Sequence, residues 1–318
     1  MHEQSSPKVA KDYRTVTADS LLEADVRSLV RLAIAEDLRD SIDWTTACMI
    51  ESENRGGCQI VSREEGVCSG LATLPWVLDE FDADLDLELL LRDGQRLTPG
   101  EPIAYLKGSV RDLLTSERTI LNILGRLCGI ATLAARFVEA ISQSQTRVYD
   151  TRKTTPGWRL LEKYAVHCGG AHNHRSGLYD GFLIKDNHLA LAGKDGNPVS
   201  ARTAAEKALQ WRGSKIEHLT APEMVEIEVD SLEQLKDVLP AQPSIILLDN
   251  FSLEDLRNAV ALRNESGSAV ELEASGNVRL DTLPAIAATG VDRISSGALT
   301  HQATSIDLGL DWLETQAC

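Results

Sequence analysis

The sequence lacks the features that mark secreted, membrane-spanning and zinc-binding chains. No two of its six cysteines have Cys-x-x-Cys spacing, which disfavours both a zinc site and a disulfide framework. The first sixteen residues contain no apolar core of the kind that a signal peptide needs. No run of about 18 apolar residues predicts a membrane span. Scattered thiols without an export signal fit a reducing compartment, so we expect a cytoplasmic protein.

Basic residues are also scarce, because 32 lysines and arginines face 48 acidic residues and leave a net charge of -16. This balance disfavours nucleic acid and an anionic membrane surface as partners. Residues 151–188 are the exception, with six lysines and arginines against three acidic residues, a local charge of +3, and four histidines. A local cationic cluster in an acidic protein predicts a small ligand with several negative charges.

The apolar pattern changes near residue 146 of the 318. Before it we predict a helix over 19–38, short strands between 57 and 106, and a long helix over 110–141. After it, short apolar strands alternate with amphipathic helices, which is typical of a parallel sheet or an α/β barrel. Residues 1–18 read as a disordered lead-in.

Sequence signals also mark where individual helices start. Pro156 predicts the start of one helix and the glycine pair 169–170 its end. Asp230 and Ser252 each precede an acidic residue at capping-box spacing, so we expect them to cap the next two helices. The glycines at 125 and 129 are expected either to bend the long helix or to permit close packing against it.

Polar residues recur where five predicted strands end. They are Lys185, Glu228, Asp249, Ser275 and Gly297, and the last three gaps are 21, 26 and 22 residues, each about one βα unit. A barrel gathers the carboxyl ends of its strands on one rim, where barrel enzymes carry out their chemistry. We therefore predict a functional site at this rim, although polar strand ends also serve as helix caps.

The residue types at this rim suit a phosphorylated sugar. Gly-containing turns at 275–277 and 295–298 predict phosphate binding through backbone amides. Glu228 and Asp249 can hold ribose hydroxyls or Mg²⁺ and stabilise positive charge at a sugar carbon. Two other readings of this pair are an acid/base couple and a buried ion pair with a lysine.

The basic cluster is expected to face the same rim. Arg152 and Lys153 follow a predicted strand, and His174 and Arg175 lie in a Gly-rich loop. Arginine binds carboxylates and phosphates through two parallel hydrogen bonds, so a ligand with several anionic groups is implied. The histidines lack the helical spacing of zinc ligands, which disfavours a metal centre built from them. His301 follows the last loop and is a further candidate donor to phosphate.

Six segments resemble the quinolinate phosphoribosyltransferase family, also called nicotinate-nucleotide pyrophosphorylase (carboxylating). They are SERTILNILGRLCGIAT, TRKTTPGWRLLEKYAVHCGGAHNHRSGLYDGFLIKDNH, EIEVDSLEQ, IILLDN, LEASGN and GVDRISSGALTH. The second segment is long and highly specific, and the resemblance covers nearly the whole chain. It implies an α/β protein with an N-terminal α/β sandwich domain over 19–130, to which residues 302–318 return. An open, incomplete α/β (TIM-like) barrel of about seven strands would follow over 131–301.

The resemblance implies transfer of phosphoribose from phosphoribosyl pyrophosphate to quinolinate with decarboxylation, in NAD biosynthesis. The products would be nicotinate mononucleotide, pyrophosphate and CO₂, the cofactor Mg²⁺, and the assembly a homodimer or larger oligomer with shared sites. The residues that match the quinolinate pocket are Arg118, supplied by the neighbouring subunit, and Arg152, His174, Arg175 and Lys185. Those that match the phosphoribosyl pyrophosphate side are Lys153, Glu228, Asp249, Ser275, Gly276, Gly297 and His301. Among them Lys153, Glu228 and Asp249 would stabilise charge, and the two carboxylates would hold Mg²⁺, directly or through water.

Some positions depart from the family pattern, and three alternative functions stay open. The family's early motif appears here as EDLRDSIDWTT without its two glycines, Ala171 stands where a third glycine is common, and Trp158 replaces a leucine. One alternative is a paralogue that uses another acceptor acid or serves a molybdenum-transport operon. The others are a Schiff-base aldolase using Lys153 or Lys185 and a non-enzymatic anion-binding protein. The full set of cations and the specific long motif favour the transferase.

Overall fold

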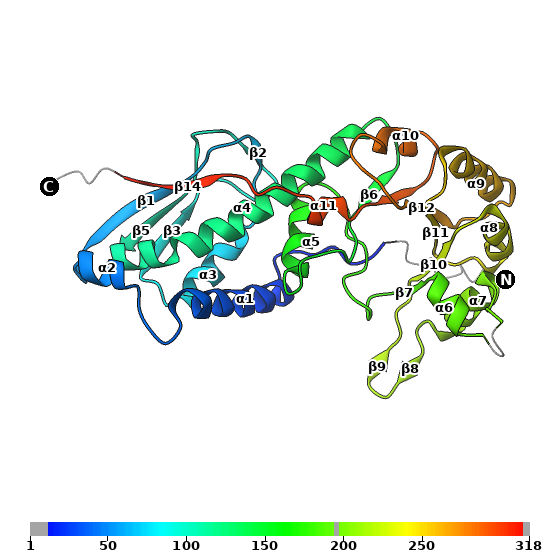
Figure 1. The fold of residues 1–318 in the computed structure, drawn as a ribbon, viewed down its shortest axis with the longest axis horizontal. Coiled ribbons are helices and arrows are strands. Elements are labelled where there is room, and N and C mark those ends of the chain that lie inside the picture. Colours follow the sequence, from blue (N-terminus) through cyan, green and yellow to red (C-terminus); the bar gives the residue numbers. More distant parts are fainter. Residues whose placement is uncertain (1–11, 194–196, 314–318) are drawn as a thin grey trace, which may run out of the picture. The chain divides into compact units, whose positions relative to one another are not determined.

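Figure 1 shows the computed structural model of the chain, which describes residues 12–193 and 197–313. Within them the chain forms two compact units. Among the described residues, unit 1 comprises 12–14, 137–152, 172–193 and 197–298, and unit 2 comprises 15–136, 153–171 and 299–313. The sequence predicts a barrel over 131–301, whereas the contacts assign residues 153–171 to unit 2.

Unit 2 contains a four-stranded antiparallel sheet in the order β14-β1-β5-β3. Its strands are β1 (Arg55–Ser62), β3 (Leu85–Leu89), β5 (Pro102–Ser109) and β14 (Leu308–Trp312). A second, two-stranded pair consists of β2 (Gly66–Val67) and β4 (Arg96–Leu97). Strand β14, from residues 308–312, pairs with β1 and forms one edge of the sheet whose other strands come from residues 55–109.

Two helices of this unit match the helices predicted over 19–38 and 110–141, whereas those at 44–49, 71–73 and 74–80 were not predicted. The helices of the unit are α1 (Ser20–Leu38), α2 (Trp44–Met49), the 3-10 helix η1 (Leu71–Thr73), α3 (Leu74–Glu80), α4 (Val110–Ala140), which continues into unit 1, and α5 (Arg159–Cys168). Asp19 caps α1 by accepting from the backbone amides of Leu21 and Leu22. Buried Leu22, Val26 and Val30 form one face of α1, at the spacing of a helix with one apolar side.

The long helix α4 is apolar because most of it is buried. By length and composition it is the single helix in the described part of the chain able to cross a membrane, but 72% of its apolar window is buried inside the protein. The core helix of a globular protein shows the same pattern. A side chain at Gly129 would lie 2.0 Å from the carbonyl oxygen of Thr304, so glycine here permits close packing, one of the two predicted roles.

Unit 1 contains a six-stranded sheet in the order β6-β13-β12-β11-β10-β7, with every neighbouring pair parallel. The strands are β6 (Arg147–Tyr149), β7 (Phe182–Ile184), β10 (Val225–Val229), β11 (Ile245–Asp249), β12 (Glu271–Ser275) and β13 (Arg293–Ser295). An isolated parallel bridge between Tyr149 and His172 extends the sheet beyond β6. The α/β class is thus confirmed, with six strands plus this bridge where about seven were predicted.

Helices connect these strands, as the βα cadence predicted (Figure 1). They are α6 (Asp186–Leu191), α7 (Ala201–Trp211), α8 (Leu232–Val238), the 3-10 helix η2 (Leu239–Ala241), α9 (Leu253–Glu265), α10 (Leu283–Ala287) and α11 (Ala298–His301), which ends in unit 2. A short hairpin of β8 (Lys215–Ile216) and β9 (Leu219–Thr220) follows α7. Strand β11 buries apolar side chains on both faces, whereas β10 buries apolar side chains on one face and Glu226 on the other.

Two predicted helix starts need correction. Helix α5 begins at Arg159 rather than at Pro156, because residues 154–158 form a loop that packs on the helix instead of extending it. The cap of α8 is Ser231 and not Asp230, since the Ser231 side chain is the one that accepts from the Gln234 amide. The predicted cap of α9 is confirmed, because Ser252 accepts from the Asp255 amide.

Residues 12–18 pack on the protein, unlike the disordered lead-in predicted over 1–18. Tyr13 and Val16 are buried, and Tyr13 packs with Met224 and Ile245 of unit 1. Gly181 provides room for it, because a side chain there would lie 2.7 Å from the Tyr13 ring. Residues 1–11 lie outside the described part of the chain.

Candidate functional site

The predicted polar strand ends do lie in register at the carboxyl edge of the unit 1 sheet. Asp249 of β11 pairs directly with Ser275 of β12. Ile184 pairs with Ile227, which aligns the next residues of β7 and β10, Lys185 and Glu228. Because parallel strands end at the same edge, these four side chains come from neighbouring positions, where such sheets bind ligands.

Lys185 and Glu228 form an ion pair at this edge. The Lys185 ammonium donates to Oε2 of Glu228, with 43% of the lysine side chain and 13% of the glutamate side chain exposed. The backbone amide of Lys185 also donates to Nδ1 of His188, at 3.0 Å. One residue predicted for the dicarboxylate pocket is therefore paired with one predicted for the sugar-phosphate side.

The turn after β12 has a backbone that favours glycine. Gly276 adopts φ 99°, and a Cβ there would lie 2.2 Å from Oδ1 of Asn250. The Asn250 amide donates to the Ser275 carbonyl at 2.9 Å, and the Asn250 side chain donates to Asp249 at 2.8 Å. These contacts hold the ends of β11 and β12 together, and Asn250 occupies the space that a side chain at residue 276 would need.

Arg152 and Arg175 carry guanidinium donors that the described residues do not use. Among the described residues, the buried Nε atoms of both arginines have no hydrogen-bond partner. Arg175 is 7% exposed and donates through Nη1 to the Gly181 carbonyl at 3.1 Å. Burial lowers the pKa of Arg175, but arginine remains charged at any neutral pH. A buried cation with unused donors is costly unless a ligand completes its bonds.

Asp150, which the sequence reading overlooked, shapes the loop that carries His174 and Arg175. Its carboxylate is buried and accepts from the His174 backbone amide and the Asn173 side chain, both at 2.8 Å. In turn the Arg175 amide donates to Nδ1 of His174 at 2.8 Å. A signal was present in the sequence, because an aspartate directly after the apolar strand 147–149 is a polar strand end of the same kind as Asp249.

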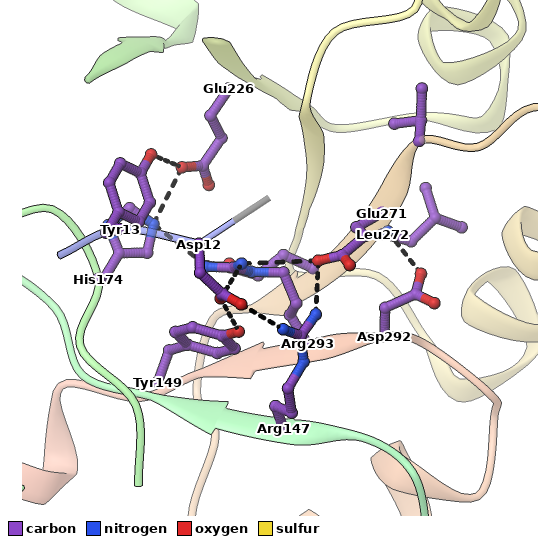
Figure 2. Close-up of polar contacts among 12 residues, drawn as sticks. Asp12, Tyr13, Arg147, Tyr149, His174, Glu226, Glu271, Leu272, Asp292 and Arg293 are labelled. Atoms are coloured by element: carbon purple, nitrogen blue, oxygen red, sulfur yellow. Dashed lines mark hydrogen bonds and ion pairs between the residues drawn. The ribbon is translucent and has the colours of Figure 1, made fainter. Parts of the chain in front are cut away.

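Beneath this loop the sheet interior is charged rather than apolar. His174 Nε2 lies 3.0 Å from Glu226 and 3.5 Å from Glu273, and Arg293 Nε donates to Glu273 at 2.8 Å. Figure 2 shows Tyr13 and His174 converging on Glu226. Burial lowers the pKa of His174, but the two carboxylates raise it by more. The amide hydrogen bond to Nδ1 nevertheless requires that nitrogen to be unprotonated, so we assign the neutral Nε2–H tautomer.

The trio of His174, Glu226 and Glu273 also meets the spacing of a metal site, with ligand atoms within 4.8 Å of one another. We do not favour metal binding there. Tyr13 already donates to Glu226, and the positively charged Arg293 already donates to Glu273. A divalent cation would have to lie beside that guanidinium, against its repulsion. Glu228 and Asp249 offer carboxylate oxygens of the type that Mg²⁺ prefers.

Of the remaining predicted residues, Arg118, Lys153 and His301 belong to unit 2 and Gly297 belongs to unit 1. Arg118 lies exposed on α4, and Lys153 and His301 are exposed. The carbonyl of Lys153 accepts from the buried Thr300 hydroxyl at 2.7 Å, which ties the segments of Lys153 and His301 together within unit 2. Gly297 lies directly before α11 in unit 1.

The parallel α/β sheet, its polar carboxyl edge and the buried Nε atoms of Arg152 and Arg175 are typical of an enzyme that binds anionic substrates. Residues 43–128 match the N-terminal domain of quinolinate phosphoribosyl transferase, and residues 130–311 match its C-terminal domain. The chain therefore belongs to the quinolinate phosphoribosyltransferase family.

Individual relatives agree over most of their length. The chain is 41% identical over 288 residues to the nicotinate-nucleotide pyrophosphorylase [carboxylating] of Mycobacterium leprae, covering 90% of this chain and 96% of that protein. It is 39% identical to a probable enzyme of the same name from Bacillus subtilis, over 84% of this chain and 86% of the other. The solved nicotinate-nucleotide pyrophosphorylase from Francisella tularensis superimposes with a TM-score of 0.83 at 38% identity, covering 95% of this chain and all of the other.

Proposed function

We propose that this chain joins quinolinate to phosphoribosyl pyrophosphate and forms nicotinate mononucleotide, pyrophosphate and CO₂, a step of NAD biosynthesis. The family match over both domains supports the activity. The observation on the structure that carries it is the pair of buried guanidinium Nε atoms without a hydrogen-bond partner among the described residues, one in Arg152 and one in Arg175. Quinolinate is a dianion, and two carboxylates are the partners that such groups bind best.

The quinolinate pocket in this proposal is a cluster of fixed cations and one imidazole. Arg152 and Arg175 bind the two carboxylates, and Lys185 adds charge at the border with the sugar site. His174 lies in the same loop as Arg175 and contacts Glu226 in the charged sheet interior. It contributes shape and polarity to the pocket. The family resemblance supports one further cation, Arg118 of the partner subunit. The residues of the pocket are Arg118, Arg152, His174, Arg175 and Lys185.

Phosphoribosyl pyrophosphate takes the other side of the carboxyl edge. Backbone amides at Gly276 and Gly297, with Ser275, suit the 5′-phosphate, because glycine allows the backbone to approach an anion closely. Lys153 and His301 suit the pyrophosphate. Glu228 and Asp249 suit the ribose hydroxyls and the charge that develops at the anomeric carbon.

The chemistry then needs positioning and charge stabilisation more than proton transfer. The bond from the anomeric carbon to pyrophosphate breaks, and its electron pair leaves with the pyrophosphate. The carboxylates of Glu228 and Asp249 stabilise the oxocarbenium-like carbon while the pyridine nitrogen attacks it. The bond between C2 and the 2-carboxylate then breaks and releases CO₂. Its electron pair stays on C2, where the adjacent ring cation stabilises it, and C2 then takes up a proton.

Mg²⁺ is the cofactor that this donor set fits. Glu228 and Asp249 supply hard oxygen ligands at adjacent strand ends, directly or through water. When bound, Mg²⁺ would neutralise negative charge on the pyrophosphate. Replacing Asp249 with Asn should raise the Mg²⁺ concentration needed for half-maximal turnover, with little change in the KM of quinolinate.

We also propose a cytoplasmic homodimer or larger oligomer in which Arg118 of the partner subunit completes each site. Arg118→Ala and Lys185→Ala should each be nearly inactive alone. A mixture of the two variants, reassembled from dissociated subunits, should regain activity because some sites then carry neither substitution. A mixture without activity argues against a shared site.

Product analysis tests the activity itself. Purified protein is incubated with quinolinate, phosphoribosyl pyrophosphate and Mg²⁺, and nicotinate mononucleotide and CO₂ are quantified, with nicotinate as a parallel substrate. Equal amounts of the two products from quinolinate, and none from nicotinate, are expected. A folded protein that forms no product from quinolinate overturns the proposal and calls for a screen of other acceptor acids.

A further inference from the structure

The start of the chain is tied into the charged interior of unit 1 by two adjacent residues (Figure 2). Asp12 contacts Arg147 at 2.7 Å and Arg293 at 3.2 Å, and also accepts from the Tyr149 hydroxyl. The Tyr13 hydroxyl donates to Oε2 of Glu226 at 2.7 Å. Arg147 and Arg293 begin their strands, so the segment crosses the amino edge of the sheet, opposite the carboxyl edge that carries the site.

Tyr13 and His174 meet on one atom. His174 Nε2 lies 3.0 Å from Oε2 of Glu226, the same oxygen that accepts from Tyr13. The Tyr13 ring also packs on the imidazole, with the ring centroids 4.6 Å apart. Tyr13 is 7% exposed and His174 is 5% exposed, so water does not compete for these contacts.

In this group Tyr13 and His174 donate hydrogen bonds, and Glu226 accepts them. Burial and the neighbouring Glu226 raise the pKa of Tyr13, so its hydroxyl keeps its proton and donates. Oε2 of Glu226 is the shared acceptor of this group, 2.7 Å from the Tyr13 hydroxyl and 3.0 Å from His174 Nε2. Two donors on one buried carboxylate oxygen fix the orientation of both side chains.

We infer that Tyr13 is a positioning residue for the acid-binding pocket: through Glu226 and its ring contact it holds the His174 imidazole beside Arg175. The inference rests on the proposed role of His174. Tyr13 precedes both predicted domains, 19–130 and 131–301, and would nevertheless affect how tightly the acceptor acid binds. The other nitrogen of His174 accepts from the Arg175 amide, so a rotation of the ring would also disturb the backbone of that arginine.

The first test is Tyr13→Phe, which removes the hydroxyl and keeps the ring. Losing one hydrogen bond to a charged partner is expected to weaken quinolinate binding about 5- to 20-fold. The KM of phosphoribosyl pyrophosphate should change less than about twofold. Tyr179→Phe is the matched control, because Tyr179 is 74% exposed in the same unit, and should match wild type. If Tyr13 had only a structural role, Tyr13→Phe would lower thermal stability and would not weaken quinolinate binding more than phosphoribosyl pyrophosphate binding.

The second test separates positioning from a direct effect. In a His174→Asn background, Tyr13→Phe should no longer change quinolinate affinity, because Tyr13 acts through the imidazole. The same fold-change in both backgrounds overturns the inference. In the protein without substrate, histidine side-chain nitrogen NMR should show the Nε2–H tautomer of His174 in wild type and a mixture in Tyr13→Phe.

The NMR result does not depend on the reaction. Unchanged His174 signals in Tyr13→Phe refute the positioning role even if quinolinate is the substrate. A changed signal in a protein that does not bind quinolinate refutes the proposed substrate and leaves the positioning role intact.

Discussion

Arg126 of α4 donates through Nη2 to Oε1 of Glu162 of α5 at 2.8 Å, and the glutamate is fully buried. Glu162 also accepts from the Thr155 hydroxyl at 2.9 Å, and Arg126 donates to the carbonyls of Thr300 and Ala303. This pair therefore joins the loop after Lys153 to the segment that carries His301, within unit 2. Both segments hold residues proposed for the pyrophosphate.

Arg126→Met should destabilise the protein by about 3 kcal/mol or more, because it leaves the buried Glu162 without its cation. It should also raise the KM of phosphoribosyl pyrophosphate more than that of quinolinate. Urea unfolding and steady-state kinetics measure the two effects. Arg55→Ala, which removes an exposed ion pair with Asp84 in the same unit, should cost less than about 1 kcal/mol. Equal losses for the two variants would contradict the assignment.

Arg152→Ala and Arg175→Ala should each raise the KM of quinolinate about 10- to 100-fold, or abolish turnover, because each removes charge-assisted hydrogen bonds to a carboxylate. Arg175→Lys should recover little, since lysine lacks the planar pair of donors. Quinolinate binding measured by calorimetry separates affinity from turnover. Wild-type affinity in Arg152→Ala would remove that residue from the pocket.

Gly276→Ala should lower the affinity for phosphoribosyl pyrophosphate and cost about 1–3 kcal/mol, because the added Cβ meets Asn250 in a strained backbone region. The matched control is Gly267→Ala in the same unit. Its φ is also positive, at 66°, but no atom lies within 4 Å of the new Cβ, so only backbone strain of about 1 kcal/mol applies. If the 275–277 turn binds phosphate as proposed, only Gly276→Ala should lower the affinity for phosphoribosyl pyrophosphate.

Cysteine labelling should distinguish exposed from buried thiols. Burial raises the pKa of Cys58 and of Cys168 to about 12, whereas Cys48 is exposed. At pH 8 the thiolate fraction of Cys58 and of Cys168 is then about a thousandfold below that of an ordinary thiol. In a Cys318→Ser background, which removes the thiol outside the described residues, one thiol should react fast. Cys48→Ser should abolish that fast phase, and its persistence would contradict the burial of the others.

Much of the fold follows from local pattern. Strands such as Ile245–Asp249 are continuous apolar runs with a polar end, and their spacing of about one βα unit predicts a parallel sheet. The polar ends at Glu228, Asp249 and Ser275 could be identified as a site because parallel strands must place them at one edge. Helix starts were less certain, as at Ser231, where neighbouring residues offer equivalent caps and only backbone geometry selects one.

The sequence by itself determined the family, the parallel sheet and the cations that suit a dianion, because these depend on local residue patterns and on a long specific segment. Only the tertiary structure decided that Tyr13 contacts Glu226, 213 residues away, and that Arg293 and Glu273 pair with neither side chain exposed. Glutamates inside apolar strands look like surface residues in a sequence. Their partners come from other strands and from the start of the chain, and only folding brings those charges together.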